Sequence, residues 1–111
     1  MTQRIIDTFA RLKASNRSGF VGYIMGGDPD RETSQRVLNA LPDHGVDIIE
    51  LGMPFTDPVA DGSVIEDAGL RSLAAGMNLP TILDMAHEFR KTNDTTPIII
   101  MGYCNPVHHM G

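Results

Sequence analysis

Three carboxylates surround or occupy one stretch of the sequence that is rich in glycine and proline. Glu50 stands near the end of an apolar run at 46–51, and Asp57 and Asp61 follow it. Four glycines and prolines between positions 52 and 62 exclude a regular helix or strand there, so both aspartates are expected on a loop. Acids at the end of a strand and on the following loop are typical of the catalytic end of α/β barrels, where such side chains transfer protons.

Glu50 is the candidate general acid or base. Because side chains alternate along a strand, Glu50 is expected on the same face as Ile48, and in a barrel that face is the interior. Burying a carboxylate there is unfavourable unless the group is partnered or functional. The alternative is a structural acid that is hydrogen-bonded to nearby hydroxyls or amides.

The other candidates also have structural alternatives. Asp61 could cap the helix that follows it, and Asp57 could form an Asx turn before the next proline. Tyr23 is either an aromatic at the mouth of a site or a core side chain. The pair His108 and His109 does not predict a metal site, because adjacent side chains point apart and no other ligand pattern accompanies them.

The elements that must position these residues alternate between strand and helix, which predicts an α/β fold with a parallel sheet. Sequential strands joined by right-handed crossovers would bring their carboxyl ends to one edge. The expected strands lie at 20–25, 46–51 and 98–101, and the expected helices lie at 3–14, 30–43, 64–75 and from 78 to about 89.

Helical spacing selects the side chains that should face the core. They are Val37, Leu38 and Leu41 in the helix at 30–43, and Ile82, Leu83, Ala86 and Phe89 in the last helix. The first of these helices is expected to begin at Asp28-Pro29-Asp30, with aspartate as the cap and proline in the first turn. Asn78 is expected to cap the other.

The stretch around the carboxylates resembles a known signature. Glu50-Leu-Gly-Met-Pro-Phe-Thr-Asp-Pro-Val-Ala-Asp61-Gly is similar to that of the tryptophan synthase alpha subunit family. The resemblance extends to Gly26-Gly-Asp-Pro29, Leu70-Arg-Ser-Leu-Ala-Ala-Gly76 and Met101-Gly-Tyr-Cys-Asn-Pro106, and so covers essentially the whole chain.

The resemblance implies a lyase that cleaves indole-3-glycerol phosphate to indole and glyceraldehyde-3-phosphate by a retro-aldol reaction. It implies that Glu50 is the general acid/base and that the Asp61 carboxylate is hydrogen-bonded to the indole N–H. It also implies an indole pocket lined by Tyr23, Met101 and Tyr103.

The resemblance further implies a partner, the beta subunit, in an alpha2beta2 assembly. The partner carries pyridoxal phosphate, and no cofactor or metal is implied for the alpha subunit itself. The residues expected to face the partner are Pro54, Asp57, Pro58 and Asn105.

The implied fold is the N-terminal part of a TIM (β/α)8 barrel, with residues 1–111 as part of one barrel domain. A complete barrel needs about 250 residues, and three strands cannot close one. The chain is therefore expected to be part of a longer subunit or a truncated product. Because the phosphate-binding sequence of the family lies late in the barrel, these 111 residues are expected to be inactive alone.

Composition limits which partners and which cellular location the sequence allows. A net charge of −5 argues against nucleic acid or anionic membrane as the main partner, and no apolar run approaches the roughly 20 residues of a membrane span. The single Cys104 and the absence of a signal-peptide core at the N-terminus fit a cytoplasmic protein. The alternatives are a non-catalytic module that keeps only the partner-binding loop, and another phosphate-handling barrel enzyme.

Overall fold

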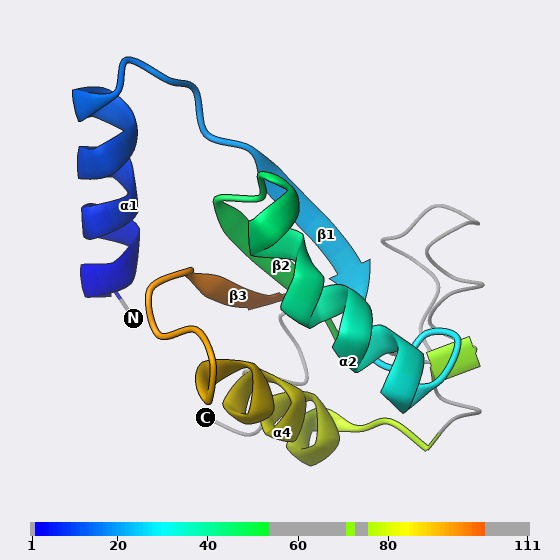
Figure 1. Ribbon diagram of the computed structural model, residues 1–111. Helices are drawn as coiled ribbons and strands as arrows, with labels where there is room; N and C mark the ends of the chain where they lie inside the picture. The colour runs from blue at the N-terminus through cyan, green and yellow to red at the C-terminus, as the bar shows by residue number, and fades with distance from the viewer. Residues whose placement is uncertain (1, 54–70, 73–75, 102–111) are drawn as a thin grey trace.

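The computed structural model describes residues 2–53, 71–72 and 76–101, and its centre is a parallel sheet of three strands (Figure 1). The strands are β1 (Val21–Met25), β2 (Ile48–Gly52) and β3 (Ile98–Met101), and they lie side by side in sequence order. The ends of these strands agree with the predicted ends to within two residues. Short apolar runs bounded by turn residues were therefore sufficient to locate the sheet.

Two helices pack on one face of this sheet. They are α2 (Arg31–Ala40), which continues into the short 3-10 helix η1 (Leu41–His44), and α4 (Leu79–Arg90) (Figure 1). Helix α1 (Thr2–Ala14) lies apart from them and is joined to the loop before β3 by a hydrogen bond from Arg4 Nε to the Asp94 carbonyl, at 2.7 Å. No helix among the described residues is long and apolar enough to cross a membrane.

The core lies between β2 and the two helices. Ile49 and Leu51 of β2 are fully buried against Leu38 of α2 and against Ile82 and Phe89 of α4. The sequences of parallel strands that are covered by helices are typically nearly continuous apolar runs. The sequence of β2 fits this description except at Glu50. The arrangement is that of a partial TIM barrel, with three consecutive strands and flanking helices.

Helix α2 begins and ends differently from the prediction. Its N-cap is Asp30, whose carboxylate accepts a hydrogen bond from the Thr33 backbone N–H at 2.8 Å, so Pro29 lies before the helix and not in its first turn. The α-helix ends at Ala40, and Pro42 lies in η1. Proline has no N–H to donate, so it is tolerated near the start of the new 3-10 turn but not inside the α-helix. The cap predicted at Asn78 is confirmed, because its side chain accepts from the Thr81 N–H.

Two side chains predicted to face the core are exposed instead. Val37 in α2 is 44% exposed and Leu83 in α4 is 48% exposed, whereas their neighbours Leu38 and Ile82 are fully buried. In α4 the buried stripe is Ile82, Met85 and Phe89, at helical spacings of three and four residues. Each error is a shift by one residue, or about 100° around the helix axis, which moves a side chain from the core edge to solvent.

The N-cap of α2 is expected to make the stability of the folded chain depend on pH. The hydrogen bond from the Thr33 backbone N–H lowers the pKa of Asp30 below its ordinary 3.8. Ionised Asp30 therefore stabilises the folded chain above that value, and this stabilisation is lost as pH falls through the lower pKa of the folded state. In thermal melts, Asp30→Ala should lower the melting temperature by a constant amount above about pH 5, and the difference should shrink in more acidic buffer.

Asn78→Ala is the matched control, because it removes the cap of α4 without removing a titratable group. Its effect on the melting temperature should be the same at pH 6 and pH 3. An Asp30→Ala deficit that stays constant down to pH 3 would contradict the assignment of the ionised carboxylate as the cap.

Candidate active site

The candidate site lies on the sheet face opposite the helices, where three predicted site residues occupy neighbouring strands. Glu50 of β2 is paired in register with Tyr23 of β1 on one side and with Ile99 of β3 on the other. Met101 ends β3 and is paired with Gly52. The fold thus brings Tyr23, Glu50 and Met101 to neighbouring positions on three adjacent strands.

Glu50 faces away from the helices, as the alternation along β2 predicts. Its neighbours Ile49 and Leu51 belong to the core under α2 and α4, so the carboxylate is on the opposite face, which is the interior face of a barrel. The side chain is half-buried and not fully buried as expected, because α2 and α4 cover the other face. Its carboxylate makes no hydrogen bond to another described residue.

Tyr23 lies over the end of β2. A Cβ atom built on Gly52 would collide with the Tyr23 hydroxyl oxygen and with its ring, so the ring occupies the space that a side chain at Gly52 would need. Tyr23 is 42% exposed, and it is therefore not a core aromatic. No such role was predicted for Gly52, although a glycine within or directly after an apolar run is a recognised sign of close approach.

Met101 contributes both its side chain and its backbone to this edge. The side chain is 40% exposed, and the carbonyl accepts a hydrogen bond from the Met53 N–H at 2.8 Å. That bond extends the pairing of β2 and β3 by one residue, to the point where the glycine- and proline-rich stretch begins. The other predicted site and partner residues lie outside the described residues, namely Pro54, Asp57, Pro58, Asp61, Tyr103 and Asn105.

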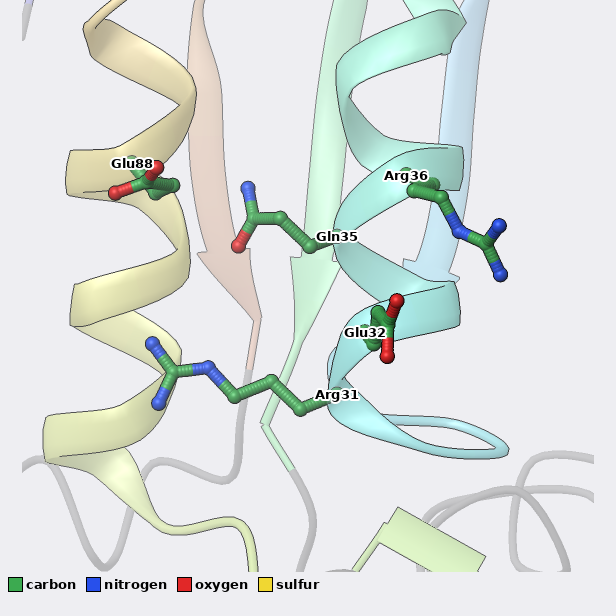
Figure 2. Close-up of a pocket in the computed structure, with 5 residues that line it drawn as sticks. All are labelled: Arg31, Glu32, Gln35, Arg36 and Glu88. Carbon is green, nitrogen blue, oxygen red and sulfur yellow. The ribbon is translucent and has the colours of Figure 1, made fainter.

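A surface hollow of about 460 Å³ lies elsewhere, between α2 and α4 (Figure 2). It is lined by Arg31, Glu32, Gln35, Arg36 and Glu88. Because α2 and α4 pack on the sheet face opposite Glu50, this hollow is separate from the candidate site. Gln35 connects the two helices there, since its Nε2 donates to the Met85 carbonyl at 3.1 Å, and we interpret the hollow as a feature of helix packing.

The arrangement is suited to proton transfer on an apolar substrate. By alternation along the paired strands, the Glu50 carboxylate shares one sheet face with the Tyr23 ring and the Met101 thioether, and ligand sites are typically apolar with a few polar groups of this kind. Within residues 2–53, 71–72 and 76–101, no three His, Cys, Asp or Glu side chains come together as metal ligands would. The described part of the site therefore offers acid/base chemistry and apolar contact.

Comparisons with known proteins agree with this architecture. The model of the family described as tryptophan synthase alpha chain matches residues 9–111. The chain superposes on tryptophan synthase subunit alpha from Legionella pneumophila str. Paris with a TM-score of 0.93 and 42% identity, over 97% of this chain and 41% of that chain.

Two further solved structures give the same result. Tryptophan synthase from M. tuberculosis in an aminoacrylate-bound form matches with a TM-score of 0.84 and 33% identity, over 97% of this chain and 43% of that chain. A structure of the tryptophan synthase a2b2 complex from Pyrococcus furiosus matches with a TM-score of 0.75 and 39% identity, over 84% and 37%. The chain spans less than half the length of each of these relatives.

Proposed function

The chain belongs to the tryptophan synthase alpha chain family, and from this premise we propose that it supplies the first part of a lyase that cleaves indole-3-glycerol phosphate to indole and glyceraldehyde-3-phosphate. The observation that carries the proposal is the position of Glu50. It is the one acid on β2, it lies on the sheet face opposite α2 and α4, and it is paired in register with Tyr23.

In the proposed reaction Glu50 is the general acid/base. A proton is delivered to C3 of the indole ring, the bond from C3 to the glycerol chain breaks, and a proton leaves the adjacent glycerol hydroxyl as it becomes the aldehyde of glyceraldehyde-3-phosphate. Asp61 accepts a hydrogen bond from the indole N–H and stabilises the positive charge that develops on that nitrogen. Tyr23, Met101 and Tyr103 hold the indole ring.

We propose the beta subunit as the partner, in an alpha2beta2 assembly. The support is the family match together with the a2b2 assembly of the Pyrococcus furiosus relative. Pro54, Asp57, Pro58 and Asn105 would face that partner. Pyridoxal phosphate would belong to the beta subunit, and this subunit would work without a cofactor. A cytoplasmic location fits the same assignment.

Residues 1–111 would form the N-terminal part of a single barrel domain, with the substrate phosphate held by the later part. The match to only 41% of the Legionella chain supports this division. The 111 residues alone would then hold Glu50 but not the phosphate site, and we expect them to be inactive.

The proposal is tested with a hybrid subunit, in which residues 1–111 are followed by the remainder of the Legionella pneumophila subunit. The hybrid should release indole and glyceraldehyde-3-phosphate in equal amounts from indole-3-glycerol phosphate, and it should co-purify with a beta subunit. A folded hybrid that binds the beta subunit but releases no indole would instead support the non-catalytic, partner-binding alternative.

A further inference from the structure

One residue in the turn after β1 contacts residues on both sides of positions 54–70. The Gly26 N–H donates to the Gly52 carbonyl at 2.9 Å. The Gly26 carbonyl accepts from the Ser72 hydroxyl at 2.5 Å. Gly52 and Ser72 are therefore both hydrogen-bonded to one residue of the turn after β1, through its two flanking peptide groups.

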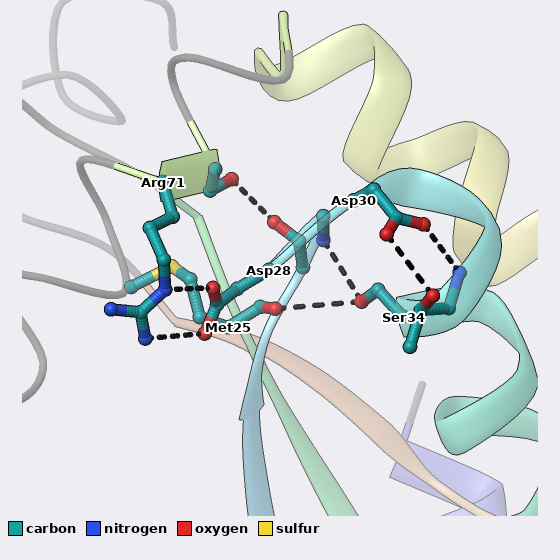
Figure 3. A network of polar contacts seen from close by, with 9 residues as sticks. Met25, Asp28, Asp30, Ser34 and Arg71 are labelled. Atoms are coloured by element: carbon teal, nitrogen blue, oxygen red, sulfur yellow. Dashed lines mark hydrogen bonds and ion pairs between the residues drawn. The ribbon is translucent and has the colours of Figure 1, made fainter.

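An ion pair reinforces this connection two residues further on. Arg71 Nε and Nη2 contact the two oxygens of the Asp28 carboxylate at 2.5 and 3.0 Å, in the paired geometry that suits a guanidinium and a carboxylate (Figure 3). The Asp28 side chain is only 18% exposed and that of Arg71 is 52% exposed. A bidentate pair with one partly buried partner has more geometric specificity than an ordinary surface ion pair.

The turn that carries Asp28 is itself fixed by buried groups. The Ser34 hydroxyl, from α2, accepts from the Gly27 N–H at 2.9 Å, and both Ser34 and Ser72 are essentially inaccessible to solvent. A Cβ atom on Gly26 would collide with Ile82 of the core, so the turn lies directly on packed side chains. Asp28 is therefore a fixed point to which Arg71 is joined.

We propose that Asp28 and Arg71 are positioning residues for the lyase reaction, which set the geometry of the segment between Gly52 and Arg71. This inference rests on the proposed function. That segment contains Asp61, which lies ten residues before Arg71 in the sequence. Gly52 before these residues and Arg71 and Ser72 after them are all bonded to the turn after β1, and small displacements of a group that acts in the transition state are costly.

The test measures kcat and KM of the hybrid subunit in complex with the beta subunit. Arg71→Ala should lower kcat by about 10- to 100-fold and change KM much less, because Asp61 acts where charge develops in the transition state. Arg71→Lys should recover only part of the loss, since lysine cannot form the paired contact. Asp28→Asn, which keeps the side-chain shape, should reproduce the Arg71→Ala defect.

Arg17→Ala is the matched control. The pair of Arg17 and Asp47 is at the opposite end of the sheet, at 3.2 Å, with side-chain exposures of 59% and 13% that resemble those of Arg71 and Asp28. It should leave kcat unchanged. Equal kcat values for folded Arg71→Ala, Asp28→Asn and Arg17→Ala subunits would overturn the positioning role.

A second readout separates this proposal from the proposed function. In the 111-residue chain, amide hydrogen exchange at residues 54–70 should be faster in Arg71→Ala than in the parent and unchanged in Arg17→Ala. This result is expected whether or not the hybrid releases indole. Unchanged exchange in Arg71→Ala would contradict the positioning role even if the parent hybrid is active.

Discussion

Replacing Glu50 with glutamine is expected to lower kcat for indole release by about 10²- to 10⁴-fold in the hybrid subunit, the usual contribution of a general acid or base. Glutamine keeps the shape of the side chain and removes only its ability to take up and release a proton. Because the Glu50 carboxylate makes no hydrogen bond to another described residue, the substitution should leave the melting temperature nearly unchanged. The measurement is steady-state indole release, with thermal melts of both proteins.

Glu88→Gln is the control for this prediction. Glu88 lies exposed on α4, where it forms an ion pair with Lys91 at 2.9 Å on the outer side of the fold. Its replacement should leave kcat within a factor of two or so of the parent, since surface pairs of this kind contribute little. If Glu50→Gln and Glu88→Gln had the same kcat, Glu50 would not be the acid/base of the reaction.

Replacing Phe89 with alanine should produce the largest loss of stability among the substitutions considered. Phe89 is 1% exposed and packs in the cluster that joins α4 to β2. Truncating a fully buried aromatic side chain typically costs about 3–5 kcal/mol, because apolar contact is lost and a cavity remains. Denaturant unfolding of the 111-residue chain should show this loss as a lower midpoint, or as a chain that no longer folds.

Leu83→Ala distinguishes this packing from the one that periodicity alone suggested. Leu83 is on the same helix but is 48% exposed, so its truncation should cost less than about 1 kcal/mol. Comparable losses for Phe89→Ala and Leu83→Ala would mean that Leu83 packs in the core, as periodicity predicted, and would contradict its exposed position.

The strands were predictable because their signals are local. Ile98–Met101 and the run that contains Ile48 and Ile49 are short, β-branched and bounded by turn residues, and their order follows from the rule that sequential parallel strands tend to be neighbours. The face of Glu50 was also predictable, because alternation along a strand has only two outcomes.

The helix faces were less predictable, since a helix offers a continuous range of orientations. Leu83 and Ile82 are equally apolar, and only the packing against β2 decides that Ile82 is buried and Leu83 is exposed. Local spacing defines an apolar stripe to within about one residue, and tertiary contacts select its centre.

The contacts that shape the candidate site could not be predicted from spacing. Asp28 and Arg71 are 43 residues apart, and no local sequence pattern around either residue predicts that the two form a pair. The Tyr23 ring of β1 likewise packs over Gly52 of β2, in space that is open only because glycine has no side chain. Such pairs depend on the register of β1 with β2, which a single sequence does not encode in any short window.

The most direct test of the central claim is indole release measured for three proteins side by side: the hybrid subunit, residues 1–111 alone, and the remainder of the Legionella pneumophila subunit alone. Indole is expected from the hybrid only, because in the proposed division residues 1–111 supply Glu50 and Asp61 and the remainder supplies the phosphate site. Release by residues 1–111 alone would contradict the division of the site between the two parts. No release by a folded hybrid would contradict the assignment of the chain as part of the lyase.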